Sequence, residues 1–223
     1  MANLARRRKE VFPVKIISNT EISPQVYVLE MEKKIDFKAG QVIAAAMHPD
    51  HNLRLYSIAS GTQEPTLKIL FDVVAEGELT PKMAKMKAGD SLYISKAFGR
   101  FTNSPNGSWW IATGTGIAPF AAMAQSEEVE EITLLQGARK LNQFYFSDLF
   151  KEKMGDNYLR FCTSESHPEV HSGRLTNFLK ENNDLIPTRK YYLCGNSNMV
   201  VEVRDLLLSK GVPFEQIIAE IYF

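Results

Sequence analysis

The pattern of hydrophobic and polar positions changes near residue 100 of the chain. Before this point, short apolar or β-branched runs follow one another, with turn signals at 19–24 and 38–40. The expected strands lie at 12–18, 26–31, 41–47, 54–58, 67–74 and 91–95. Closely spaced strands with few helical patterns predict an antiparallel barrel or sandwich. One short helix is expected among them, with Thr80 as its N-cap and Pro81 in its first position.

After a stretch at 101–108 that is rich in Gly, Pro, Asn and Ser, strands and helices alternate. The expected strands lie at 109–113, 131–137, 158–163, 190–194 and 216–222, and the expected helices at 119–125, 143–154, 175–181 and 198–210. This order predicts a doubly wound parallel sheet with helices on both faces. We therefore predict two domains, an N-terminal β-barrel over residues 1–103 and a C-terminal α/β domain over residues 104–223.

The sequence that joins the first strand of the α/β half to its first helix is Trp110-Ile-Ala-Thr-Gly-Thr-Gly-Ile-Ala-Pro-Phe120. Gly114 and Gly116 allow a sharp turn that approaches a ligand closely, and Pro119 suits the first helical position. A helix N-terminus at the carboxyl edge of a parallel sheet attracts phosphate, so a nucleotide site is predicted here. The third glycine of the usual dinucleotide motif is absent, and a purely structural turn is the alternative.

Composition narrows the classes of function. The 223 residues carry a net charge of zero, which gives no electrostatic reason to expect binding to nucleic acid or to a membrane. No apolar run is long enough to span a membrane, and the basic residues 1–9 lack the apolar region of a secretory signal. Cys162 and Cys194 lie too far apart for a C-x-x-C metal site, and their scarcity fits a reducing cytoplasm. We expect loop positions without a metal or catalytic role for His48, His51, His167 and His171.

The strand that begins at Arg54 carries the second informative pattern. Alternation places Arg54 and Tyr56 on one face, and Leu55 and Ser57 on the other. An arginine can grip a phosphate with its planar fork, and a tyrosine offers a flat surface for stacking. Taken alone, this strand is more simply interpreted as a surface strand with an arginine–aromatic pair.

Four motifs in order resemble those of the ferredoxin–NADP reductase family. They are Arg54-Leu-Tyr-Ser57, Gly77-Glu-Leu-Thr80, Gly114-Thr-Gly-Ile-Ala-Pro119 and Cys194-Gly-Asn196. The run from Gly77 to Asp90 and the ending Ala219-Glu-Ile-Tyr-Phe223 particularly resemble the bacterial ferredoxin or flavodoxin reductases. The resemblance covers almost the whole chain. It implies an FAD-dependent enzyme that exchanges a hydride between NADP(H) and flavin N5 and passes electrons to ferredoxin or flavodoxin.

The same resemblance places FAD on the barrel. Arg54 would pair with its pyrophosphate, Tyr56 would stack on the isoalloxazine, and Ser57 would bond near N5. Thr80, at the start of its short helix, would hold a phosphate. The remaining residues expected to bind this cofactor are Leu55, Gly77 and Leu79.

The nicotinamide nucleotide would lie over the glycine turn, near Thr115 and Gly116, with Asn196 beside it. Cys194 is expected to end the fourth strand of the α/β domain and to position the nicotinamide, although inert core packing is the alternative for a lone cysteine. Arg139 and Arg174 match arginines that meet a 2′-phosphate in bacterial members. Gly-Ala-Arg also resembles NAD-using relatives, and a third arginine is missing at 163–165. We expect NADP in preference to NAD.

The last strand carries Glu220 and Tyr222 on one face. The resemblance implies that Tyr222 covers the second face of the flavin and that Glu220 relays a proton between solvent and Ser57. Phe223 is an additional aromatic residue that could touch the adenine of FAD. An ordinary final strand is the alternative interpretation.

The chain has no cysteine set for an iron–sulfur cluster, so its electron acceptor must be another protein or a small molecule. A basic rim could receive an acidic ferredoxin, with ordinary solvated side chains as the alternative; it comprises Arg6–Lys9, Lys82, Lys85, Lys87, Lys96 and Arg100. Two other functions stay open: a reductase component or flavin reductase for a different acceptor, and an FAD-binding subunit of a larger electron-transfer complex. We expect a monomer or a weak dimer.

Overall fold

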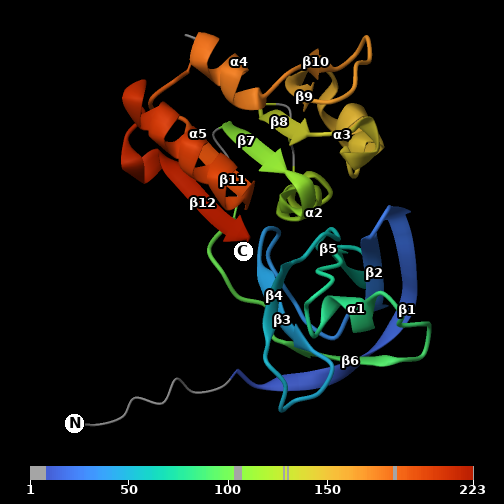
Figure 1. Ribbon diagram of the computed structural model, residues 1–223. Coiled ribbons are helices and arrows are strands. Elements are labelled where there is room, and N and C mark those ends of the chain that lie inside the picture. The colour runs from blue at the N-terminus through green and yellow to red at the C-terminus, as the bar shows by residue number, and fades with distance from the viewer. Residues whose placement is uncertain (1–8, 103–106, 128, 130, 183–184, 223) are drawn as a thin grey trace.

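The computed structural model describes residues 9–102, 107–127, 129, 131–182 and 185–222, with residue 222 described by its backbone only. Two sheets of different kind stack end to end in the molecule (Figure 1). The first is built from the N-terminal half of the chain and the second from the C-terminal half. This arrangement confirms the predicted pairing of an antiparallel barrel with a parallel α/β sheet.

The N-terminal sheet is antiparallel, with strand order β4-β3-β6-β1-β2-β5. Its strands are β1 Val11–Ser23, β2 Val26–Glu32, β3 Val42–Ala46, β4 Arg54–Ser57, β5 Thr66–Asp72 and β6 Ser91–Ser95. A bridge between Ile58 and Ile69 joins the two edges, so the sheet closes into a barrel. Alternate residues such as Val14 and Ile16 are buried in its core, as the period of a strand requires.

The expected turn at 19–24 is wrong for residues 19–23, because β1 continues to Ser23. The strand serves two partners in succession: Val11–Lys15 pair with β6, and Ile16–Ser23 pair with β2. The hydrogen bonds of a ladder come from the backbone, so a polar run such as 19–23 pairs as well as an apolar one. The actual turn lies at Gln25, whose φ is 63°.

The short helix α1 spans Thr80–Met83. Thr80 is therefore its first residue and not its N-cap, and Pro81 takes the second position. The N-cap residue is Leu79, which makes no side-chain capping bond. The Thr80 Oγ1 atom instead accepts a hydrogen bond of 2.9 Å from the backbone N–H of Val74, which fastens the helix to the end of β5.

The C-terminal sheet is parallel, with strand order β10-β9-β8-β7-β11-β12. Its strands are β7 Ser108–Thr113, β8 Thr133–Ala138, β9 Tyr158–Cys162, β10 His171–Ser172, β11 Lys190–Asn196 and β12 Ile217–Tyr222. Its helices are α2 Ala118–Ala124, α3 Ser147–Met154, α4 Leu175–Glu181 and α5 Ser197–Ser209, and its 3₁₀ turns are η1 Gly114–Ile117, η2 Leu141–Gln143, η3 Gly155–Asn157 and η4 Phe214–Gln216.

Two neighbouring tryptophans on β7 show how the faces of this sheet are covered. Trp110 packs with Phe120 of α2 and Phe150 of α3, whereas Trp109 packs with residues of α4 and α5 such as Val203. Successive side chains of a strand point to opposite faces, so the helices lie on both sides of the sheet, as predicted.

Several boundaries differ from the expected ones for local reasons. The helix expected at 143–154 begins only at Ser147, because Phe146 adopts a left-handed φ of 59°. Pro119 is the second residue of α2, since η1 precedes the helix. Strand β11 continues two residues beyond Cys194, and the two-residue strand β10 was not predicted.

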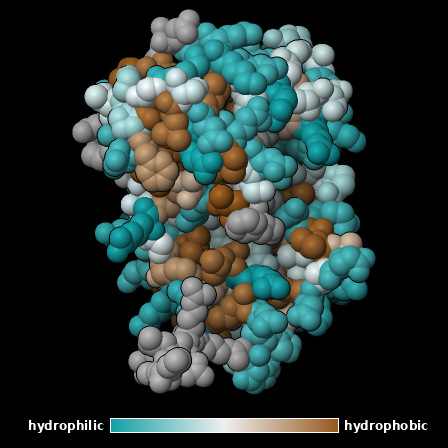
Figure 2. Space-filling model, turned by 60° about the vertical axis from the view of Figure 1, so that its left-hand side comes forward, coloured by the Kyte–Doolittle hydropathy of each residue, from teal (hydrophilic) through white to brown (hydrophobic). Residues whose placement is uncertain are grey.

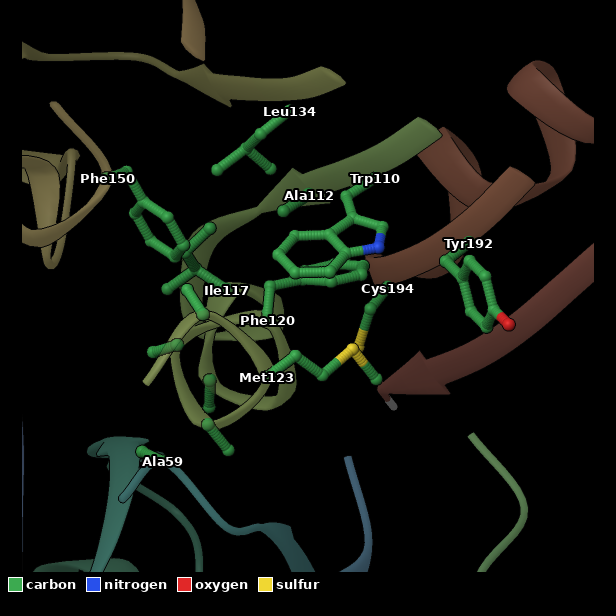
Figure 3. Close-up of a cluster of buried hydrophobic side chains, with 14 of the residues drawn as sticks. Ala59, Trp110, Ala112, Ile117, Phe120, Met123, Leu134, Phe150, Tyr192 and Cys194 are labelled. Carbon is green, nitrogen blue, oxygen red and sulfur yellow. The ribbon is translucent and has the colours of Figure 1, made fainter. Parts of the chain in front are cut away.

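The two halves share one hydrophobic cluster. Val26, Leu70 and Phe101 of the barrel side belong to the same cluster as Trp110 and Phe120. Figure 3 shows Ala59 facing the residues of α2 across this contact. The predicted domain boundary between residues 103 and 104 lies outside the described part of the chain and stays a prediction.

Polar contacts join the same surfaces. The Nε2 group of Gln125 donates to the Ala59 carbonyl at 2.9 Å, and the N–H of Thr62 donates to Ser126 Oγ at 2.9 Å. The hydroxyl of Tyr192 donates to the Thr102 carbonyl at 2.9 Å. The barrel and the parallel sheet are therefore held in one relative orientation.

Candidate active site

The glycine turn after β7 lies against the end of β11. A Cβ atom on Gly116 would lie 2.4 Å from the Cys194 carbonyl oxygen, and one on Gly195 would lie 2.5 Å from the Thr113 carbonyl oxygen. Both glycines are thus required for these two backbone segments to touch. Gly114 has a φ of 56° and faces open space, so the top of the turn can be approached from outside.

A groove of about 930 Å³ opens at this carboxyl edge of the parallel sheet. It brings together Thr115, Arg139, Arg174 and Asn196, which the sequence had assigned to one nucleotide. Most of the other lining residues were not predicted, and Asp72, Val74 and Tyr145 are three of them. These three come from the barrel and from the loop after β8, and no local motif marks them.

The two arginines differ in their surroundings. Arg174 pairs with Glu202 at 2.5 Å and is about half exposed. The turn at Arg139 is held by its backbone, whose N–H donates to Gln143 Oε1 at 3.1 Å and whose carbonyl accepts from the N–H of Ser164 at 3.0 Å. Ser164 stands where a third arginine was expected, so the segment that lacks it lies directly against Arg139.

A smaller cavity of about 310 Å³ lies on the barrel, between the loop before β4 and helix α1. It brings Arg54 and Leu79 together, as the FAD assignment requires. Its other lining residues are Met47, Asp50, His51, Asn52, Glu78 and Lys82. Gly77 and Thr80 do not line this cavity but belong to the turn behind it, where both bond to Val74.

The rest of strand β4 runs on from Arg54 without lining this cavity. Tyr56 is partly buried, packs edge-on against Phe71 at 6.5 Å between ring centroids, and has its pKa raised by burial. Leu55 is 59% exposed, and Ile221 of β12 is 37% exposed. Figure 2 shows apolar side chains gathered across the middle of this face, where the two halves meet. Exposed apolar surface of this kind marks a binding site.

Ser57 and Glu220 meet at the junction of the two halves. Ser57 is buried at the end of β4, and its Oγ donates to Glu220 Oε2 at 3.4 Å. Glu220 lies on β12, in register with Cys194 of β11. Burial raises the pKa of Glu220 to about 7, and the hydrogen bond from Ser57 partly opposes this rise. Glu220 can therefore gain or lose a proton near neutral pH.

Cys194 is fully buried and its side chain packs beside Trp110 and Phe120 (Figure 3). This packing agrees with the alternative interpretation of Cys194 as an inert core residue. Its role in positioning the nicotinamide stays a prediction. The backbone of Tyr222 pairs with Asn196, whereas its side chain and all of Phe223 lie outside the described residues.

The described part of the chain holds neither a candidate metal-binding group nor a membrane-spanning helix. It contains no group of three or more His, Cys, Asp or Glu residues that could hold a metal ion. None of its helices is long and apolar enough to cross a membrane.

Comparison with known proteins assigns a class to each half. Residues 13–103 match the oxidoreductase FAD-binding domain, and residues 110–205 match the oxidoreductase NAD-binding domain. A ferredoxin–NADP reductase of Azotobacter vinelandii is 28% identical over 206 residues, which cover 79% of this chain and 80% of that protein. Together the two domain matches cover most of the chain, which thus pairs an oxidoreductase FAD-binding domain with an oxidoreductase NAD-binding domain and is similar to ferredoxin–NADP reductases. It is an oxidoreductase with one domain for FAD and one for a nicotinamide nucleotide.

Similar proteins also include one that is named as part of a dioxygenase. The reductase component 1 of a terephthalate 1,2-dioxygenase from Comamonas is 26% identical, covering 98% of this chain and 69% of that protein. Among solved structures, a ferredoxin NADP⁺ reductase from Neisseria gonorrhoeae with bound FAD and NADP superposes with a TM-score of 0.86 at 22% identity. That match covers 96% of this chain and 99% of the other, and it supports the two-domain fold.

Proposed function

We propose that this enzyme transfers electrons between NADP(H) and a one-electron carrier protein, ferredoxin or flavodoxin. The contact between Ser57 of the FAD-binding domain and Glu220 of the NAD-binding domain carries this proposal. It joins the strand that bears Arg54 to β12, which pairs with β11, the strand that brings Asn196 to the groove. The two domains would then jointly supply the protein groups around the reacting atoms.

The residues of the barrel fit FAD. The cavity beside β4 presents the cations of Arg54 and Lys82, which suit phosphate, beside the carboxylates of Asp50 and Glu78. Further along the same strand, Tyr56 offers a ring and Ser57 a hydroxyl. FAD would supply the capacity to accept a hydride and to release electrons one at a time. We assign Leu55, Gly77, Leu79 and Thr80 to the same site, within a domain of residues 1–103.

The residues of the α/β domain, 104–223, fit a nicotinamide nucleotide. The Gly114–Ile117 turn presents Thr115 to the groove, Gly116 lies buried beneath it against the end of β11, and Asn196 ends that strand. Arg139 and Arg174 would recognise the 2′-phosphate of NADP. Cys194 would lie beside the nicotinamide and position it. Tyr222 and Phe223 complete the proposed set as aromatic residues at the flavin.

An anaerobic titration tests the function most directly. Purified protein should be yellow, and NADPH should bleach its flavin at lower concentration than NADH does. The reduced protein should then reduce ferredoxin or flavodoxin in preference to free riboflavin. A protein that binds no FAD, or that prefers free riboflavin, would contradict the proposal.

Replacing Arg139 and Arg174 together with alanine is expected to raise the KM for NADPH at least about tenfold, because each lost charged hydrogen bond is worth roughly 1.5–3 kcal/mol. The KM for NADH should change less than about twofold, since NADH has no 2′-phosphate. Steady-state kinetics with both nucleotides measure this difference. Arg204→Ala is a matched control, because Arg204 pairs with Asp205 on the outside of α5. Equal changes for the two nucleotides would refute the assignment to NADP.

The basic rim predicts a dependence on salt. Lys82, Lys85, Lys87, Lys96 and Arg100 are described, whereas Arg6, Arg7 and Arg8 lie outside the described residues. Electron transfer to an acidic ferredoxin should slow about tenfold or more between low and high ionic strength, because salt screens the attraction that steers the encounter. Stopped-flow rates measure this effect, and reduction of an uncharged quinone is the control. A rate that does not respond to salt would exclude the rim as the docking surface.

The relative from Comamonas supports a second candidate, a reductase component for another acceptor protein. This function uses the same two domains and differs in the partner. Side-by-side turnover with ferredoxin, flavodoxin and a dioxygenase-type iron–sulfur protein would separate the two candidates.

A further inference from the structure

Helix α1 forms one wall of the cavity that we assign to FAD. Leu79 and Lys82 face this cavity opposite Arg54. The helix has only four residues and no side-chain cap at its start. A single helical turn is not stable by itself in water, so the position of this wall depends on contacts with the rest of the barrel.

One such contact comes from Asn19 on strand β1. Its Nδ2 group donates to three backbone carbonyls at the end of the helix, those of Met83 at 2.9 Å, Ala84 at 3.2 Å and Met86 at 3.1 Å. The last carbonyls of a helix lack their usual N–H partners. The Asn19 amide supplies donors to this segment, in addition to the bond that the Met83 carbonyl accepts from the N–H of Met86. Asn19 thus ties the end of α1 to a strand more than 60 residues earlier in the chain.

The orientation of this amide is fixed by its surroundings. The Asn19 Oδ1 atom is buried and has no hydrogen-bond partner among the described residues, so the bonds of its side chain all go to the helix end. The reverse orientation would set Oδ1 against three carbonyl oxygens and repel them. Asn19 is therefore suited to donate here, and a carboxylate of the same size is not.

We propose that Asn19 is a positioning residue for the FAD site. By holding the end of α1, it sets the distance of Leu79 and Lys82 from Arg54 and so the width of the cavity that receives the phosphates. This inference rests on the proposed function, because it assigns the cavity to FAD. Asn19 does not line the cavity, so it acts through the helix.

The test compares Asn19→Ala and Asn19→Asp with wild type, and uses Ser18→Ala as control. Ser18 is the neighbouring residue on β1, and its hydroxyl bonds to Glu30 and not to the helix. Three quantities are measured: the Kd for FAD, amide exchange of residues 79–88 in FAD-free protein, and binding of adenosine 2′,5′-bisphosphate to the α/β domain.

Asn19→Ala should raise the Kd for FAD at least about tenfold and speed exchange at 79–88, with binding of the bisphosphate unchanged. Asn19→Asp should bind FAD more weakly still at pH 8. The affinity of Asn19→Asp for FAD should rise at pH 5.5 to that of Asn19→Ala or above it. A carboxyl beside carbonyl oxygens takes up a proton more readily than a free one, and the protonated carboxyl can again donate to a carbonyl. Ser18→Ala should stay within about twofold of wild type throughout.

An unchanged Kd for FAD in both Asn19 variants would overturn the role of Asn19, and so would unchanged amide exchange. A parallel loss of bisphosphate binding would also overturn it, because that loss would show general unfolding. A wild-type protein that takes up no FAD would overturn the proposed function itself and the inference with it, and the wild-type measurement alone reveals that case.

Discussion

Arg54→Ala is expected to yield a protein that purifies almost without FAD and binds added FAD at least about 100-fold more weakly than wild type. The guanidinium is exposed at the start of β4 and lines the cavity on the barrel, with Leu79 and Lys82 on the opposite wall. A bidentate arginine–phosphate pair combines two charged hydrogen bonds, each worth roughly 1.5–3 kcal/mol, and so supports a loss of this size. Absorbance of the purified protein and fluorescence titration with FAD measure it.

Two further variants show whether the shape of the guanidinium and its place in the cavity, rather than charge alone, explain this loss. Arg54→Lys keeps the charge but loses the planar fork, so its affinity for FAD should fall between those of wild type and Arg54→Ala. Lys34→Ala removes an exposed positive charge of the same barrel that pairs with Glu32 away from the cavity, and it should leave FAD binding unchanged. Full retention of FAD by Arg54→Ala would show that the pyrophosphate lies elsewhere.

The second large effect is expected for Glu220→Gln. Turnover with the one-electron acceptor should fall about 10- to 100-fold, a typical contribution of a positioned proton-transfer group, while the FAD content stays at the wild-type level. The pKa of Glu220 is raised to about 7, so in the wild type kcat should change across neutral pH as this carboxyl ionises. Glutamine resembles the protonated form but transfers no proton, so the same profile should become flat in the variant. An unaltered pH profile would remove Glu220 from the proton path.

The same substitution has a consequence for stability. Because the folded-state pKa of Glu220 is raised above that of the unfolded chain, the wild type loses stability as the pH rises from about 4.5 through about 7. At about 1.4 kcal/mol for each pKa unit, this loss is at most about 3.5 kcal/mol at pH 8. Urea unfolding should show a smaller pH dependence for Glu220→Gln than for wild type, and equal dependences would contradict this account.

The sequence was informative where function depends on local patterns. The glycine turn, the Arg54–Ser57 strand and the alternation of strands and helices are each contained within a few neighbouring residues. They predicted both sheets, the helices on both faces of the second one, and four lining residues of the nucleotide groove, Thr115, Arg139, Arg174 and Asn196. The order of the four motifs added the resemblance to ferredoxin–NADP reductases, which the domain matches and the similar proteins support.

The sequence was less informative where a residue acts through distant parts of the chain. Asp72 and Val74 reach the groove only because the barrel is docked on the parallel sheet. The sequence predicted Thr80 as the N-cap, one residue before the helix. In the structure its hydroxyl bonds to Val74 and does not cap the helix. The polar residues 19–23 resembled a turn. They pair as a strand because the hydrogen bonds between strands come from the backbone and do not require apolar side chains.

The hydrophobic cluster shared by the two halves links their stabilities. Neither half can unfold without exposing the apolar side chains that the other half packs against it, such as Phe101 against Phe120 at 5.5 Å between ring centroids. The chain should therefore unfold as one cooperative unit although it carries two nucleotide-binding domains. A nucleotide that binds only the folded state adds its binding free energy to that common transition. Saturating either domain with its cofactor thus protects the other from heat and from proteases.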